Sequence, residues 1–389
     1  MVRPGRADAG APLVRRRPRR THPDHAADRG GARAELHGHR ADARVPAHAR
    51  DHAARQPPHA PAVRPRPVGS FRCRVDRLVP PLDVNPLAID PQARAVMDYL
   101  ASLKLPAFDQ IPAAEARRLY RETRVALRPA VPDLPVVRDL PAGAVPVRLY
   151  RPADGVRPAF IFFHGGGWVV GDLDTHDTVC RQIARESNTV VIAVDYRLAP
   201  EHRFPAAADD AWTATTWVAA HAAELGIDPQ RIAVGGDSAG GGLAAVVALQ
   251  ARDSRQLRLA LQVLIYPVMD LRAASDSYSR FAEGYSLTRA GMQWYIAQYA
   301  PTPEATNDWR ASPSLAPWVH GVAPAIIIAS ELDPLVDEGA AFARRLQGAR
   351  VPVDYQVMPA MIHGFLTMGG KVDAANEAIS VMATALRAL

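Results

Sequence analysis

Cysteine is scarce in this chain of 389 residues, which contains only Cys73 and Cys180. Two cysteines cannot build the disulfide framework of a small secreted domain, so we expect a reducing compartment and a cytoplasmic location. No apolar run of about 18 residues occurs, so we expect no membrane span. The N-terminus carries basic residues without an apolar segment after them, unlike a secretory signal peptide.

Lysine is absent before Lys104 and isoleucine before Ile89, and these absences set the first 80 residues apart. Residues 1–80 contain 18 Arg and 7 acidic residues, a net charge of +11. Subtracting them from the chain totals of 46 basic and 40 acidic residues leaves 28 and 33, a net charge of −5. The basic excess therefore comes from one end, and the body gives no indication of nucleic acid binding.

Residues 1–80 are dominated by Arg, Ala, Pro and His. Such a segment buries too little apolar surface to offset its ordering entropy, so we predict a disordered extension. It could be a basic arm for nucleic acid or acidic lipids, a transit peptide, or GC-rich upstream DNA translated from a start codon placed too early. We favour the last, because GC-rich codons encode Ala, Arg, Gly and Pro in any frame.

The remainder, 85–389, alternates between predicted strands and helices. Two predicted helices, 90–103 and 112–127, come first. The predicted strands are 145–150, 159–163, 189–195, 231–235, 259–266, 325–330 and 353–358. The predicted helices among them are 175–186, 206–225, 239–251, 336–347 and 373–386, with an irregular insert at 273–322. The apolar strands and their alternation with helices predict an α/β fold with a mostly parallel central sheet covered on both faces.

The segment Gly236–Asp237–Ser238–Ala239–Gly240 follows a predicted strand and begins a helix of small residues. This is the G-x-S-x-G pattern in the strand, turn and helix context that makes a serine a nucleophile. The flanking glycines let backbones approach closely in a strained turn. The same pentapeptide could also be a glycine-rich turn from strand to helix with no catalytic role. The catalytic interpretation therefore needs support from the other motifs of the chain.

A second glycine-rich segment, His164–Gly165–Gly166–Gly167–Trp168, ends the predicted strand 159–163. Three glycines after a strand allow backbone N–H groups to converge on one point. Together with the N–H of Ala239, they predict an oxyanion hole for a tetrahedral intermediate. A phosphate-binding loop is the weaker interpretation, since neither G-K-[ST] nor G-x-G-x-x-G is present.

A serine nucleophile needs a base, and in this order of motifs the acid and then the histidine follow it. Only His320 and His363 lie beyond Ser238. His363 follows the last predicted strand, whereas His320 precedes a strand and belongs at the opposite edge. We therefore predict His363 as the base and His320 as a surface or packing residue.

Four acidic residues, Glu331, Asp333, Asp337 and Glu338, follow or end the strand at 325–330. Asp333 stands in the loop before Pro334, whereas Asp337 and Glu338 fall in a first helical turn, where acids favour the helix dipole. We predict Asp333 as the acid that orients His363.

Five motifs together resemble the hormone-sensitive-lipase-like esterases, the bacterial family IV related to arylacetamide deacetylase. They are H-G-G-G-W, Y-R-L-A-P-E-H-R-F-P-A at 196–206, G-D-S-A-G-G, D-P-L-V-D-E-G at 333–339 and H-G-F at 363–365. The resemblance covers about residues 85–389 and implies an α/β-hydrolase fold.

The resemblance also implies site roles and a cap. It makes Ser238, Asp333 and His363 the triad and Gly166, Gly167 and Ala239 the oxyanion donors. Gly165 and His164 would shape the glycine loop, and Asp237 would place the chain among the G-D-S-A-G members. Residues 85–130, with part of the insert, would form a small helical cap over the acyl pocket. The family needs no metal and no cofactor.

The resulting functional prediction is a carboxylesterase for short- to medium-chain esters, acting through an acyl-enzyme on a small-molecule substrate. An amidase or deacetylase acting on small aryl amides or acetyl esters is the alternative, since the same triad serves both. A non-catalytic ligand-binding protein of this fold would require a lost triad member, and none is lost. The sequence does not identify the physiological ester, and it does not decide whether the protein forms a homodimer.

Deletion of residues 1–80 tests the predicted extension. We expect ester hydrolysis and thermal stability close to those of the full chain, because every predicted strand and motif lies beyond the deletion. The isoelectric point should fall sharply, since 18 Arg leave with only 7 acidic residues. Loss of activity or solubility after the deletion would make this segment a structural part of the protein.

Overall fold

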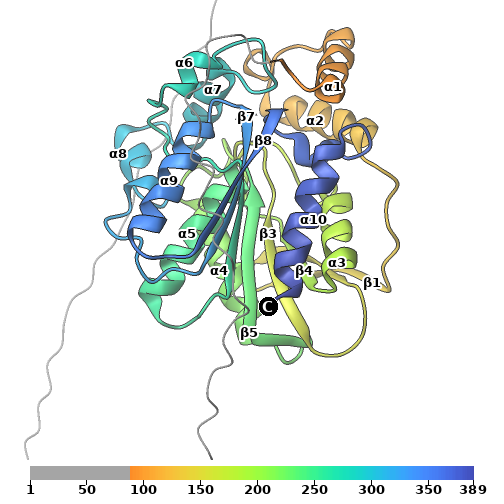
Figure 1. Cartoon of the computed structure of the whole chain (residues 1–389), viewed down its shortest axis with the longest axis vertical. Coiled ribbons are helices and arrows are strands. Elements are labelled where there is room, and N and C mark those ends of the chain that lie inside the picture. Colours follow the sequence, from red (N-terminus) through yellow and green to blue (C-terminus); the bar gives the residue numbers. More distant parts are fainter. Residues whose placement is uncertain (1–87) are drawn as a thin grey trace, which may run out of the picture. The chain divides into compact units, whose positions relative to one another are not determined.

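The computed structural model describes residues 88–389. The predicted extension at 1–80 lies outside this range. Within it, the alternating strands and helices form the expected α/β arrangement around one sheet (Figure 1).

The sheet has eight strands in the order β1-β2-β4-β3-β5-β6-β7-β8. Their bounds are Val136–Ala142 (β1), Val145–Arg151 (β2), Arg157–Phe163 (β3), Val190–Val194 (β4), Ile227–Asp237 (β5), Leu261–Ile265 (β6), Ala325–Leu332 (β7) and Val353–Ile362 (β8). Strands β3 to β8 pair in parallel, whereas β2 is antiparallel to both of its neighbours. The carboxyl ends of the parallel strands therefore meet at one edge, where ligands of open α/β sheets bind.

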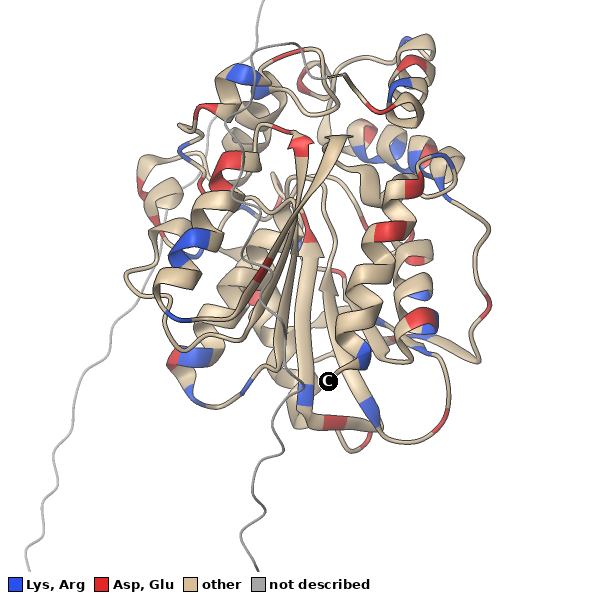
Figure 2. Cartoon of the chain, viewed as in Figure 1, with Lys and Arg blue, Asp and Glu red and all other residues tan. Residues whose placement is uncertain are grey.

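Five longer helices cover the two faces of the sheet. They are α3 (Asp177–Ser187), α4 (Ala206–Ala220), α5 (Ala239–Ser254), α9 (Val336–Gly348) and α10 (Asp373–Arg387). Helices α3 and α10 pack together on one face, and α4, α5 and α9 lie on the other (Figure 1). Every residue of β4 and β6 is buried, as a sheet covered on both faces requires. Most charged residues lie on helices, in loops and near strand ends (Figure 2).

Additional helices precede the first strand or lie in the insert. They are α1 (Pro91–Ser102), η1 (Phe108–Gln110) and α2 (Ala113–Leu127) before the first strand, and α6 (Ser277–Arg280), α7 (Arg289–Tyr299), α8 (Pro303–Asn307) and η2 (Pro313–Leu315) in the insert. Of these, α1, α2, α6 and α7 lie beyond the carboxyl edge of the sheet, whereas α8 lies beside α9 (Figure 1). The remaining short helix, η3 (Phe365–Met368), follows β8. The two groups meet where Phe108 packs against Trp294, with ring centroids 6.5 Å apart. No helix among residues 88–389 is long and apolar enough to cross a membrane.

Strand β1 is absent from the sequence-based prediction. It contains Pro141, and Arg138 and Asp139 interrupt its apolar pattern. Proline removes a ladder hydrogen bond and is tolerated on an edge strand, and β1 pairs only with β2. The predicted strand 353–358 also continues to Ile362, through Pro359 and through Ala360 at a φ of 58°.

The buried centre of β7 provides a test of the fold. Ile327 is fully buried in this strand. Ile327→Ala should lower the free energy of unfolding by about 2–5 kcal/mol, because it removes buried apolar contacts and leaves a cavity. Val156→Ala is the control, since Val156 is 66% exposed and should change little. Equal effects in urea unfolding would contradict this account of the core.

Candidate active site

Ser238 stands at a sharp turn between β5 and α5. Its φ of 56° and ψ of −119° are strained for a residue with a side chain. A Cβ on Gly236 or Gly240 would overlap the carbonyl oxygen of Phe163 at the end of β3. Glycine at both positions therefore lets this turn lie against β3.

Ser238, His363 and Asp333 form a connected set of hydrogen bonds. Ser238 Oγ lies 2.9 Å from His363 Nε2, and His363 Nδ1 lies 2.6 Å from Asp333 Oδ2. Because a carboxylate only accepts hydrogen bonds, Nδ1 carries the proton and Nε2 accepts one from the hydroxyl. Asp333 is fully buried, and its Oδ1 accepts from Leu335 N–H at 2.9 Å. Such a relay can activate a hydroxyl for nucleophilic attack.

The register of β7 and β8 brings the carboxylate and the imidazole together. Leu332 pairs with Ile362 at the ends of the two strands, and Asp333 and His363 are the residues that directly follow. This pairing follows a register shift after Ser330, opposite the segment that contains Ala360. The continuation of β8 beyond residue 358 therefore places His363 beside Asp333.

The glycine loop after β3 contributes free backbone donors. The N–H groups of Gly166 and Gly167 have no hydrogen-bond acceptor within the described chain, and Ala239 begins α5, where N–H groups lack partners inside the helix. Gly165 differs, because its N–H donates to Asp237 Oδ1 at 2.8 Å. Gly165 belongs to the predicted oxyanion loop, but its N–H is already used and a Cβ there would overlap Asp237. This contact agrees with the loop-shaping role that the resemblance implies for Gly165.

Asp237 connects several parts of the site. Besides the N–H of Gly165, its carboxylate faces His176 Nε2 at 3.2 Å and accepts from the Tyr266 hydroxyl at 3.5 Å. Burial raises the pKa of Asp237, but His176 and the Gly165 N–H outweigh this effect, so the pKa lies below its usual value. The carboxylate is therefore ionised at neutral pH and holds the glycine loop against the turn of Ser238.

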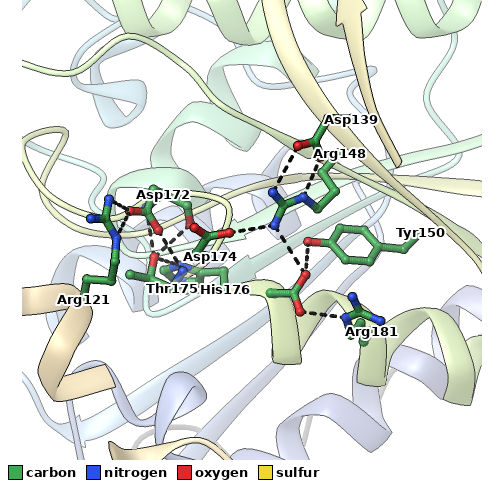
Figure 3. A network of polar contacts seen from close by, with 10 residues as sticks. Arg121, Asp139, Arg148, Tyr150, Asp172, Asp174, Thr175, His176 and Arg181 are labelled. Carbon is green, nitrogen blue, oxygen red and sulfur yellow. Dashed lines mark hydrogen bonds and ion pairs between the residues drawn. The ribbon is translucent and has the colours of Figure 1, made fainter. Parts of the chain in front are cut away.

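A polar network extends from His176 to the surface (Figure 3). Thr175 Oγ1 lies 3.0 Å from His176 Nδ1 and bonds to the backbone of Asp172. The Asp172 carboxylate accepts from the Thr175 N–H and from Arg121 on α2. Helix α2 is thereby fastened to the segment that positions His176.

His164 holds the glycine loop through contacts of its ring and of its backbone carbonyl. Its ring stacks on Tyr196 with centroids 4.3 Å apart, and its Nδ1 donates to the carbonyl of Gly165 at 2.9 Å. The Tyr196 hydroxyl donates to the carbonyl of His164 at 2.6 Å. Burial, reinforced by the nearby His176, lowers the pKa of His164 to about 4.

The other acidic and histidine candidates lie elsewhere. Asp337 accepts from the N–H of Ser277 and from Arg280, which fastens α6 to α9. Glu338 is buried and accepts from the N–H of Met269 at 2.7 Å, and burial raises its pKa well above the usual range. His320 is exposed in the turn before β7.

A pocket of about 480 Å³ opens onto Ser238 and His363. Its walls come from both groups of helices beyond the sheet edge and from the glycine loop. Aromatic residues contribute to these walls, and Tyr295 lies so close to Gly167 that a Cβ on Gly167 would overlap its ring. A ligand in this pocket reaches the hydroxyl and the free N–H groups together.

Three contributors to the site escape prediction from the sequence. They are His176, Tyr266 and Arg124, which lines the pocket. Tyr266 packs on His363 with ring centroids 4.6 Å apart, and its hydroxyl accepts from the N–H of Leu366. Tyr266 comes directly after β6, at the carboxyl edge of the sheet. A polar aromatic residue at that edge is the one feature of the sequence that could have indicated its role in the site. The sequence around His176 and Arg124 offers none.

Comparison with known proteins places these motifs in context. Residues 160–367 match the family described as alpha/beta hydrolase fold. The chain is 41% identical over 287 residues to ethyl acetate hydrolase of Pseudomonas putida, covering 71% of this chain and 90% of that protein. It is 44% identical over 253 residues to carboxylic ester hydrolase LipN of Mycobacterium tuberculosis, covering 62% and 67%.

A solved structure shares the architecture. The hyperthermophilic esterase from the archaeon Pyrobaculum calidifontis superposes with a TM-score of 0.73 at 36% identity. The similarity covers 77% of this chain and 98% of that one. It therefore extends over nearly the whole esterase chain.

The lowered pKa of His164 predicts a pH-dependent stability. Between pH 6.5 and 4 the unfolded chain protonates this histidine while the folded chain does not, so stability is lost as pH falls. From pH 7 to 5, we expect His164 to cost about 2 kcal/mol of unfolding free energy. His164→Gln should lose correspondingly less over this range in urea unfolding, with the exposed His320→Gln as control. Equal losses in wild type and His164→Gln would refute a neutral, buried His164.

Proposed function

Because the chain belongs to the alpha/beta hydrolase fold family, in its hormone-sensitive-lipase-like branch, we propose that Ser238, His363 and Asp333 are its catalytic triad. The chain is a carboxylic ester hydrolase of the serine type. The observation that carries the proposed triad is the pair of hydrogen bonds, 2.9 and 2.6 Å long, that joins the three side chains. Ser238 and His363 line the pocket, and Asp333 is buried behind His363.

In the acylation step, Ser238 Oγ attacks the ester carbonyl carbon while His363 Nε2 takes its proton. The carbonyl electron pair moves onto oxygen, and the N–H groups of Gly166, Gly167 and Ala239 stabilise that charge. One such donor is typically worth about 3 kcal/mol of barrier. The imidazolium then gives its proton to the leaving alkoxide, so an alcohol departs and an acyl-serine remains.

In the deacylation step, a water molecule attacks the acyl-serine. His363 takes the water proton and returns it to Ser238 Oγ, which releases the carboxylic acid and restores the site. Asp333 stabilises the imidazolium in both steps and keeps the proton on Nδ1. Its complete burial strengthens that interaction.

We propose short- to medium-chain carboxylic esters as substrates, with residues 85–130 and part of the insert as the cap. The supporting observation is the limited volume of the pocket, about 480 Å³, with α2 and α7 among its walls. The same relay suits a small aryl amide, so amide cleavage is the alternative.

We further propose a cytoplasmic location. Cys180 is a free thiol buried in α3, and unpaired thiols suit a reducing compartment. Fractionation of the native host would test this proposal.

Removal of triad members tests the proposed chemistry. Ser238→Ala and His363→Ala should each lower kcat by about 10⁴-fold or more while leaving the fold intact, because both remove the relay. His320→Ala is the matched control and should retain wild-type turnover, since His320 is exposed far from the relay. A fluorophosphonate should label wild type on Ser238, as read by peptide mass. Near wild-type turnover by Ser238→Ala would overturn the triad.

A substrate series separates ester from amide chemistry. With 4-nitrophenyl esters of increasing acyl length and the matched 4-nitroanilides, we expect kcat/KM to be highest for short to medium esters, because the pocket limits acyl length. Faster cleavage of the anilides than of the esters would favour the amidase alternative.

A further inference from the structure

Helix α2 directs three arginines toward the body of the protein, at positions 117, 121 and 124. Arg117 donates to the carbonyls of Val169 and Ala199 and to the carboxylate of Glu201. Arg121 donates twice to Asp172. Both guanidinium groups thus have acceptors, and they fasten α2 beside the glycine loop.

Arg124 differs, because it has no carboxylate or carbonyl acceptor among residues 88–389, and its polar neighbour is the Tyr120 side chain. Its Nε and Nη1 atoms are buried without a hydrogen-bond partner. No other Arg or Lys among residues 88–389 has a buried side-chain nitrogen without such a partner. A guanidinium remains charged at any ordinary pH. Arg124 is half-buried, but these two donors are withdrawn from water without an acceptor, which is costly. They are therefore available to an acceptor on a ligand.

The Arg124 side chain lies within the pocket described above. It is one of the residues lining the cavity that opens onto Ser238 and His363. Its guanidinium carbon lies 4.7 Å from the ring centroid of Tyr120, which holds the group by a cation–π contact. Its Nη2 lies 3.8 Å from the position that a Cβ on Gly364 would occupy, directly after His363.

The carboxylates that line the pocket do not neutralise Arg124. They are Asp109 and Asp237. Asp109 is exposed and makes no ion pair with it, and Asp237 faces the N–H of Gly165, His176 and Tyr266 instead. A positive charge is therefore positioned beside His363, against the ring of Tyr120, and no carboxylate of residues 88–389 pairs with it.

We infer that Arg124 is a specificity-determining residue and that the ester substrate carries a carboxylate, which Arg124 binds within the pocket. A guanidinium matches a carboxylate in geometry and charge. The inference rests on the proposed function, since it names the substrate class of the same site. The carboxylate can belong to the acyl half, as in a dicarboxylic acid monoester, or to the alcohol half.

Binding is measured first, in a Ser238→Ala background that cannot turn the ligand over. The ligands are monomethyl glutarate, which is anionic, and dimethyl glutarate, which is neutral, titrated by calorimetry. For the alcohol half the pair is 3-acetoxybenzoate and 3-acetoxybenzamide. We expect the anion of one pair to bind at least about tenfold more tightly than its neutral counterpart, since a hydrogen bond to a charged group is worth that much.

Substitutions then assign that preference to Arg124. Arg124→Met should abolish it and Arg124→Lys should retain part of it, because the lysine keeps the charge without the planar fork. Arg118→Gln on the same helix is the control, since it removes one positive charge from an exposed group paired with Glu115 and Glu122. It should leave the preference unchanged.

Two results would overturn the inference. One is equal binding of anion and neutral ligand in both pairs by the Ser238→Ala protein, a result that needs no Arg124 variant to fold. The other is a preference that Arg124→Met, shown to be folded by its thermal midpoint, leaves intact. Wild-type turnover of 4-nitrophenyl butyrate is measured in parallel: its absence counts against the proposed function, whereas the binding ratios decide the role of Arg124.

Discussion

The buried carboxylate of Asp237 is the contact on which the geometry of the site depends. It binds the N–H of Gly165, which orients the glycine loop, and it lies against His176 and the hydroxyl of Tyr266. Tyr266 in turn packs on His363. Asp237 also directly precedes Ser238. One ionised side chain thereby contacts the glycine loop, adjoins Ser238 and binds Tyr266, which packs on His363. The buried environment strengthens each of these contacts.

Helix α2 connects the active site with the helices beyond the carboxyl edge of the sheet. Two of its arginines are satisfied by the backbone around the glycine loop and by Glu201 and Asp172, so the helix is held in place by charge as well as by apolar packing. The third, Arg124, has no carboxylate or carbonyl partner in the described part of the chain, and two of its nitrogens are buried without a hydrogen bond. Stable structures normally pair buried charges, and exceptions concentrate at functional sites.

Much of the fold follows from local pattern. The apolar runs of β3, β4, β6 and β7 and the turn residues between them predict buried parallel strands, and these strands are found. The pattern does not predict β1, because Pro141 and two charged residues interrupt the apolar alternation of this edge strand. It also ends β8 too early, because Pro359 is atypical of a strand interior. In both places pairing with a neighbouring strand outweighs local preference, and such pairing is a property of the tertiary structure.

The sequence by itself determined the candidate nucleophile, base and acid, because a glycine-flanked serine, a late histidine and a loop aspartate each follow a strand. The choice of oxyanion donors came from the family resemblance, because three adjacent glycines look alike in sequence. The physical difference lies in the tertiary structure: Asp237 occupies the N–H of Gly165 and leaves those of Gly166 and Gly167 free. The roles of His176, Tyr266 and Arg124 were decided by the tertiary structure alone. Each acts through neighbours distant in the chain, and whether a buried charge has a partner depends on three-dimensional packing, which residue spacing does not encode.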